Sequence, residues 1–379
     1  MNILTLTPFF PNPLDQAQGC FVSEPLAALS KIGVEGTVLL AQPFYRAATR
    51  PISDAVAAEL VRYWSLPGGW GLSSAGAFLF ASSLQRVRRL HSGKKIDAIH
   101  AHGPLPCGHA AMLLAAELKI PYVVSVHGLD AYATNQVPGM AGQWCRRVSE
   151  RVYRLASRVI CVSQHVAEKV LAGGPRIPTS VVYNGVDPEL FFPGNQPAPP
   201  PTILSIGNLI PVKGHATLLR AFAAIASQYP DLHLDFVGDG RERERLVALA
   251  RELRVDQRVR FLGRKSRTEV AKLLRDSVLF ALPSKYEGLG CVYLEAMSSG
   301  KVAIGCRGQG IEEIIRHGFD GWLVSPENVQ ELSGALSTLL SNVALRDSIE
   351  MHARQTVLQR LTLTHQALQL REIYEEVSL

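Results

Sequence analysis

Short runs of apolar residues alternate with stretches of helical periodicity along almost the whole chain of 379 residues. Such alternation is typical of β-α-β units, in which crossover helices join parallel strands. The strands predicted in the first half are 2–6, 36–41, 98–101, 122–126, 159–162 and 180–183, with an amphipathic helix over 22–32. Those predicted in the second half are 203–206, 233–237, 259–262, 278–282, 302–305 and 322–324, with helices over 215–229, from 241, over 292–299 and near 311–316. The pattern therefore predicts an α/β fold of doubly wound parallel sheets.

A cluster of prolines interrupts this alternation once. Five of the nine residues from 193 to 201 are proline, which neither a helix interior nor a central strand accommodates. We therefore expect two Rossmann-like domains, at residues 1–192 and 202–360, joined by a linker at 193–201 and facing a central cleft. Residues 361–379 show a helical pattern without a strand, so we expect a C-terminal helical extension that packs back on the first domain.

Composition and charge exclude several classes of protein. Apolar residues make up 47% of the chain and charged residues 19%, which excludes a disordered protein. The net charge of +6 is too small for a nucleic-acid-binding stripe. Residues 1–190 hold most of this charge, with 17 Lys and Arg against 12 Asp and Glu. The first domain is therefore the half suited to an acidic acceptor or an anionic membrane surface, although solvated helix faces explain the same arginines equally well.

The positions of the basic residues define two stretches of the first domain. They are Arg86, Arg88, Arg89, Lys94 and Lys95, and then Arg146, Arg147, Arg151, Arg154 and Arg158. The segment 64–70, with a tryptophan at each end, is a candidate interfacial or acceptor-gripping element, or a loop packed on the core.

Cysteines and hydropathy indicate the compartment. The six cysteines include no Cys-x-x-Cys pair, and Cys107 with its neighbouring histidines lacks the spacing of zinc ligands, so no metal is expected. The N-terminus lacks the basic region of a secretory signal. Proline and glycines interrupt the charge-poor stretch 66–84, so it is not expected to span a bilayer. We expect a cytoplasmic protein, with at most peripheral contact at the inner face of the plasma membrane.

Two glutamates eight residues apart give the strongest chemical signal. Glu287 follows a predicted strand within a glycine-containing loop, and Glu295 lies on the next predicted helix. Ligands of a parallel sheet bind at this edge, and a carboxylate there can accept hydrogen bonds from two sugar hydroxyls. A capped helix with solvated or ion-paired glutamates is the structural alternative.

Two further residues follow predicted strands. Lys213 directly precedes a helix, where an ammonium suits a diphosphate, although most such lysines are plain surface residues. His127 follows a buried strand of the first domain, where a histidine is either reactive or structural. No Walker A motif occurs, and no Gly-x-Gly-x-x-Gly motif follows a strand, which argues against a nicotinamide enzyme.

Taken together and in this order, the segments resemble the retaining glycosyltransferases of family 4, which have the two-domain GT-B architecture. The matching segments are Gly19, 127–130, 161–163, 184–187, 207–214, 237–240, 261–263, 287–297 and 321–324. They span nearly the whole chain. The resemblance implies a hexosyltransferase that uses a nucleotide diphosphate sugar, with UDP favoured, and a glycan or lipid-linked saccharide as acceptor in polysaccharide or glycoconjugate biosynthesis.

The resemblance also implies a role for each matching residue. Glu287 would contact the donor sugar, Glu295 the nucleotide ribose, and Lys213 the diphosphate. His127 would face the transferred sugar. The other implied donor contacts are Gly19, Asn208, Gly238, Arg264, Gly288, Leu289 and Gly290. The leaving phosphate itself would take the acceptor proton, so neither an enzyme nucleophile nor a metal cofactor is implied.

Two departures from the family pattern are present. Asn208 stands where family members usually carry a second diphosphate-binding arginine, and Arg264 and Arg307 are candidate substitutes. The segment 306–313 replaces the more usual Gly-Gly-x-Pro-Glu turn. A nucleotide-sugar epimerase on the same fold, or a non-catalytic partner subunit, are the alternative functions.

Overall fold

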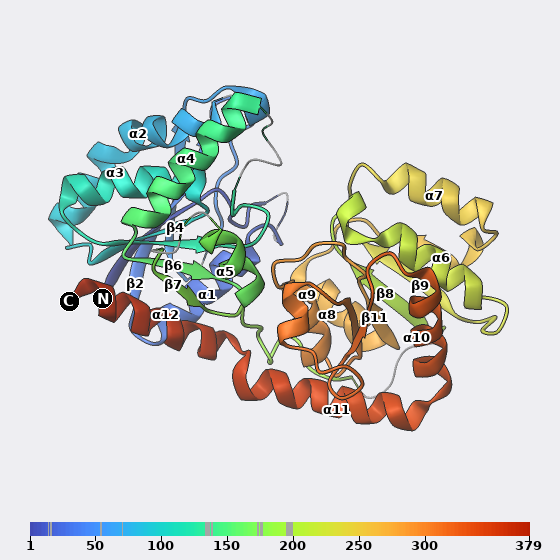
Figure 1. Cartoon of the computed structure of the whole chain (residues 1–379). Helices are drawn as coiled ribbons and strands as arrows, with labels where there is room; N and C mark the ends of the chain where they lie inside the picture. Colours follow the sequence, from blue (N-terminus) through green and yellow to red (C-terminus); the bar gives the residue numbers. More distant parts are fainter. Residues whose placement is uncertain are drawn as a thin grey trace. The chain divides into compact units, whose positions relative to one another are not determined.

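The chain folds into two compact units in a computed structural model. The structure describes residues 1–379 except 14, 16, 54, 70, 133–136, 138, 173, 175, 176 and 195–199. Unit 1 comprises residues 1–184 and 363–379, and unit 2 comprises residues 185–362 (Figure 1). The proline-rich segment 193–201 therefore lies in part outside the described residues.

Unit 1 is built on a parallel sheet with the strand order β3-β2-β1-β4-β5-β6-β7. The strands are β1 (Asn2–Thr7), β2 (Glu35–Pro43), β3 (Ala57–Tyr63), β4 (Ala98–His102), β5 (Tyr122–Val126), β6 (Arg158–Cys161) and β7 (Thr179–Val181). The helices are α1 (Cys20–Lys31), α2 (Leu72–Gly93), α3 (His109–Leu118), α4 (Gly139–Leu155), α5 (Gln164–Leu171) and α12 (Leu363–Ser378). Helices α2, α3 and α4 pack together as one layer, and α1 and α12 pack together in another (Figure 1).

Unit 2 repeats this design with the strand order β10-β9-β8-β11-β12-β13. The strands are β8 (Thr202–Ile206), β9 (His233–Val237), β10 (Val259–Phe261), β11 (Leu279–Ala281), β12 (Ala303–Cys306) and β13 (Trp322–Val324). The helices are α6 (His215–Ile225), α7 (Arg243–Glu252), α8 (Arg267–Asp276), α9 (Cys291–Ser298), α10 (Val329–Ser341) and α11 (Val343–Arg360). The order reverses between β8 and β11, which is the switch point where such sheets bind ligands at their carboxyl edge.

The doubly wound fold predicted from the sequence is confirmed, with two local corrections. Strand β3 was not predicted, because it lies at the sheet edge and mixes alanines with Glu59 and Arg62 instead of forming an apolar run. The predicted helix at 311–316 is a single 3-10 turn at Gly310–Glu313. Among the described helices, none combines the length and apolar composition that crossing a bilayer requires.

The C-terminal helix contributes to the core of unit 1. Ala367, Leu370 and Tyr374 of α12 are buried in one cluster with Ile3 and Leu29. The Tyr374 hydroxyl lies 2.6 Å from Nδ1 of the buried His100, so α12 is held by a polar contact as well as by apolar packing.

Candidate functional site

Two loops meet at the switch point of unit 2. The loop after β8 ends in the 3-10 turn Pro211–Lys213, and Gly214 then opens α6 with a φ of 70°. The loop after β11 runs to Gly290, which opens α9. The Lys285 amide donates to the Val212 carbonyl at 2.7 Å, so one backbone hydrogen bond joins the two loops. Because β8 and β11 are neighbouring parallel strands, their carboxyl ends deliver both loops to the same edge.

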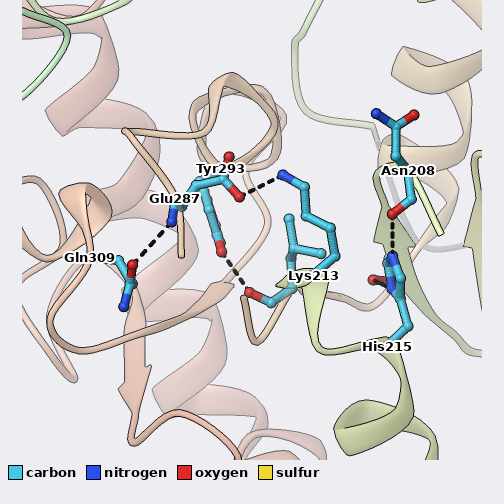
Figure 2. A network of polar contacts seen from close by, with 8 residues as sticks. Asn208, Lys213, His215, Glu287, Tyr293 and Gln309 are labelled. Atoms are coloured by element: carbon cyan, nitrogen blue, oxygen red, sulfur yellow. Dashed lines mark hydrogen bonds and ion pairs between the residues drawn. The ribbon is translucent and has the colours of Figure 1, made fainter. Parts of the chain in front are cut away.

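The side chains of Lys213 and Glu287 face each other across these loops. The Lys213 ammonium donates to Oε2 of Glu287 at 2.6 Å, and Figure 2 shows the two side chains pointing toward one another. The side chains are only 19% and 14% exposed, so the pair is partly screened from water. The Glu287 amide donates to Oε1 of Gln309 at 3.0 Å, which ties the loop to the segment after β12. The structure therefore brings together two of the residues for which the resemblance implies contacts with the donor.

His215 contacts the backbone of the loop that carries Lys213. It is 2% exposed, with Nε2 lying 3.2 Å from the Asn208 carbonyl and Nδ1 lying 3.3 Å from the Ser205 hydroxyl (Figure 2). Burial lowers the pKa of His215 to about 4, so the ring is neutral at physiological pH. Since a carbonyl only accepts, the proton belongs on Nε2, and Nδ1 accepts from the serine hydroxyl.

Helix α9 places the second glutamate in the interior. Glu295 is 4% exposed, and its Oε1 accepts from Nη1 of Arg267 at 2.6 Å. Tyr293 on the same helix donates its hydroxyl to the Leu282 carbonyl at 2.5 Å, which anchors α9 to the end of β11 (Figure 2). Gly288 and Leu289 are buried in the turn that leads to Gly290, whose φ of 84° suits glycine.

Gly238 allows a close approach of three loops of unit 2. Its φ is 128°, its amide donates to the Gly263 carbonyl at 2.8 Å, and a Cβ there would lie 2.1 Å from the Gly207 carbonyl oxygen. Asn208 and Arg264 follow two of these glycines, and both are exposed. Apart from Glu295 on α9, the predicted donor residues of unit 2 thus lie in loops that leave β8, β9, β10 and β11 at one edge of the sheet.

The two remaining predicted residues belong to unit 1. Gly19 caps α1 with a φ of 71°, and a Cβ there would lie 2.5 Å from the Phe9 carbonyl carbon, so the loop depends on glycine. His127 follows β5, and its Nε2 lies 2.9 Å from Nδ1 of His102. The rings of His100, His102 and His127 stack in sequence, with centroids 4.5 and 5.2 Å apart.

This histidine stack is neutral. Burial lowers the pKa of each ring, that of His100 to about 3. Two backbone amides, of His127 and Gly128, donate to Oδ1 of Asp130, which fixes the turn after β5. Within the described residues, no three His, Cys, Asp or Glu side chains are arranged to hold a metal ion.

Sequence reasoning missed four residues that position the site: His215, Tyr293, Gln309 and Arg267. Tyr293 lies inside the glutamate motif, and His215 directly follows the glycine after Lys213, so both stood next to recognised residues. Arg267 follows Ser266, which with Glu269 forms a capping box that starts α8. That cap is readable from the sequence, but the contact with Glu295 is not, because 28 residues separate the partners.

Comparisons with known proteins agree with this layout. Residues 186–356 match the family model described as glycosyl transferases group 1, and residues 26–190 match the model described as glycosyltransferase family 4. An uncharacterized glycosyltransferase of Methanocaldococcus jannaschii is 28% identical over 285 residues, which cover 75% of this chain and 76% of that protein.

Two solved structures are similar over 99% of this chain. Sucrose-phosphate synthase from Thermosynechococcus elongatus is 20% identical with a TM-score of 0.80, and 99% of it is covered. The Anabaena protein HepE in complex with UDP-glucose is 22% identical with a TM-score of 0.75, and all of it is covered. These likenesses show the fold.

Proposed function

We propose that this chain, whose two halves match glycosyltransferase family models and which has the GT-B fold, transfers a hexose from a UDP-sugar to a glycan or lipid-linked saccharide, with retention of configuration. The observation that carries the proposal is the Lys213–Glu287 pair at the switch point of unit 2. The Lys213 ammonium suits a diphosphate and the Glu287 carboxylate suits sugar hydroxyls, and a nucleotide sugar carries both groups.

The electrostatics of the loop favour an anion beside Lys213. The ammonium lies at the start of the eleven-residue helix α6, whose first backbone amides add a partial positive charge. Asn208 is exposed at the same loop and can donate a hydrogen bond without adding charge. The diphosphate would therefore rely on Lys213 as the cation of this loop.

The choice of UDP is supported by one structural neighbour. HepE from Anabaena was solved in complex with UDP-glucose. In this chain, Glu295 would accept hydrogen bonds from the ribose hydroxyls, and the backbone near Arg264 would meet the base. Gly238 permits the close loop packing that this arrangement needs.

Transfer would proceed without an enzyme nucleophile. The bond between the anomeric carbon and the diphosphate oxygen breaks, and the acceptor hydroxyl forms the new glycosidic bond on the same face. The departing phosphate oxygen takes the acceptor proton, while Lys213 stabilises the charge that develops on the diphosphate. We propose that no metal is needed, since Lys213 supplies the positive charge.

A ligand screen and two substitutions test the proposal. At about 100 times its dissociation constant, UDP should add roughly 2.7 kcal/mol of stability, whereas GDP, ADP, CDP and dTDP should add less. Replacing Lys213 by Ala should lower kcat/KM by about 10²- to 10³-fold, as expected when one charge-stabilising donor is lost. Glu287→Gln should slow transfer without weakening UDP binding.

The matched control is Lys272→Ala, which removes an exposed lysine of α8. It should behave as the wild type in both assays. Full activity of the Lys213 and Glu287 variants would overturn the assigned roles. Formation of a new nucleotide sugar without acceptor would instead favour the epimerase.

A further inference from the structure

Two neighbouring helices of unit 1 expose large apolar side chains near the ends where they begin. On α4, Met140 is 86% exposed and Trp144 is 59% exposed. On α2, Phe78 is exposed, and its ring contacts that of the exposed Trp64 at a centroid distance of 5.0 Å. Leu66, in the loop that follows Trp64 and precedes α2, is exposed as well. A group of this kind on one layer of a soluble fold marks a contact surface.

The beginnings of the two helices lie side by side, as Figure 1 shows. Ala141 and Cys145 of α4 pack in one apolar cluster with Leu72, the first residue of α2. Met140 and Trp144 each directly precede one of these packed residues, so they lie on the adjoining flank of α4. We call the exposed group Met140, Trp144, Trp64, Leu66 and Phe78 the apolar end. Trp70, at the other end of the predicted interfacial segment, lies outside the described residues.

Arginines continue the same face of α4 beyond the apolar end. Trp144, Arg147 and Arg151 follow one another at spacings of three and four residues, which places them in one exposed stripe. In the part of the chain that the structure describes, neither arginine forms an ion pair with an acidic side chain. By contrast, Arg86 and Arg88 of α2 pair with Glu59 and Glu117. Arg147 and Arg151 thus give α4 two neighbouring positive charges that no acidic side chain of the described residues compensates.

We propose that unit 1 docks on an anionic lipid bilayer through the apolar end and the arginine stripe of α4. Tryptophan and methionine would enter the headgroup region, and Arg147 and Arg151 would meet lipid phosphates. An interfacial helix needs this combination, an apolar group for insertion and cations for anionic headgroups. Because the exposed arginines are positively charged, the partner of this surface is expected to be a negatively charged membrane.

The docking surface lies at a functional edge of unit 1. Helices α2 and α4 begin at the carboxyl edge of the parallel sheet, and His127 follows β5 at that same edge. Docking would bring this edge to the membrane, where the sugar of a lipid-linked acceptor would be presented. The position of the acceptor rests on the proposed function, whereas the docking itself does not.

Vesicle binding of the full chain tests the docking. We expect binding to phosphatidylcholine vesicles in which about a third of the lipid is phosphatidylglycerol, weakening as salt is added, and little binding to phosphatidylcholine alone. Replacing both Arg147 and Arg151 by Gln should weaken binding about 30-fold, which corresponds to roughly 1 kcal/mol per arginine. Replacing Met140 and Trp144 by Ser should also weaken binding.

Two exposed residues of unit 2 provide matched controls. Arg251→Gln and Met351→Ser make the same chemical changes at exposed positions and should leave vesicle binding unchanged. Transfer to a water-soluble acceptor should be the same in all variants, so a loss there would concern the proposed function and not the docking.

Three results would overturn the proposal. The first is equal binding to neutral and anionic vesicles, and the second is unchanged binding of both double variants. The third is self-association in sedimentation velocity that the Met140 and Trp144 variant abolishes without any vesicle binding. That result would assign the surface to a second copy of this chain.

Discussion

The buried ring of His215 makes the stability of unit 2 dependent on pH. Its pKa falls from the ordinary value of 6.5 to about 4, because burial disfavours the imidazolium and Lys213 adds repulsion. Because the pKa of His215 is lower in the folded than in the unfolded chain, its neutral ring stabilises the fold fully at pH values above the unfolded-state pKa. That contribution is lost as the pH falls from 6.5 toward 4. His215 therefore lowers the free energy of unfolding only on the acidic side of its unfolded-state pKa.

The magnitude follows from the two pKa values. Lowering the pH from about 7.5 to about 5 should cost roughly 2 kcal/mol through this residue alone. His215→Gln removes the titration while leaving an amide that can donate to the Asn208 carbonyl and accept from Ser205. The wild type should therefore lose about 2 kcal/mol more than this variant over the same pH interval.

Urea unfolding followed by tryptophan fluorescence measures this difference. Trp322 in β13 reports unit 2 when the other three tryptophans, all in the sequence of unit 1, are replaced by Phe. The neutral histidine stack of unit 1 adds acid sensitivity of the same sign, but it is common to both proteins and cancels. Equal pH dependence of the wild type and the Gln variant would refute a neutral, buried His215.

Three further outcomes follow from the loops of unit 2. Gly238→Ala should lower the free energy of unfolding by more than about 3 kcal/mol in urea titrations, because its Cβ would collide with the Gly207 carbonyl. Gly263→Ala, at a left-handed φ of 68° and with no atom within 4 Å of the added Cβ, should cost only about 1 kcal/mol, and equal losses would contradict the steric argument. Asn208→Arg should tighten UDP binding by about tenfold in calorimetry, since it adds a charged donor beside the diphosphate; unchanged affinity would place Asn208 away from the ligand. EDTA should leave the initial rate of transfer unchanged, whereas loss of activity that Mg²⁺ restores would contradict the metal-independent mechanism.

The central strands could be predicted because burial on both faces makes them short apolar runs. Strands β5 and β9 begin and end where the sequence indicated. The edge strand β3 lacks this signal, since Glu59 on one face and Arg62 on the other interrupt its apolar residues. Its pairing with β2 is a tertiary contact, which local composition does not encode.

The site could be predicted as a location but not as a set of contacts. Lys213 and Glu287 each follow a strand, and the sheet rule places both at one edge. That they meet in an ion pair depends on the turn at Gly214 and on the hydrogen bond that the Glu287 amide donates to Gln309, which joins residues 22 positions apart. The arginines of unit 1 illustrate the same limit, because the acidic partner of Arg158 is Glu376 on α12.

Both carboxylates of the glutamate motif already accept a hydrogen bond from a cation within unit 2. Glu287 accepts from Lys213, and the buried Glu295 accepts from Arg267. Under the proposed function, a diphosphate that draws the Lys213 ammonium away would leave Glu287 unpaired, and an unpaired carboxylate at 14% exposure would be costly. The hydroxyls of the donor sugar compensate, because they can donate to the freed Glu287 while the phosphate takes the ammonium. In donor binding, the Lys213–Glu287 contact would then be replaced by two contacts, one from Lys213 to the phosphate and one from the sugar hydroxyls to Glu287. A nucleotide without its sugar would supply only the first of these contacts. The same pair can thus favour the complete nucleotide sugar over the free nucleotide and hold the loops of unit 2 together.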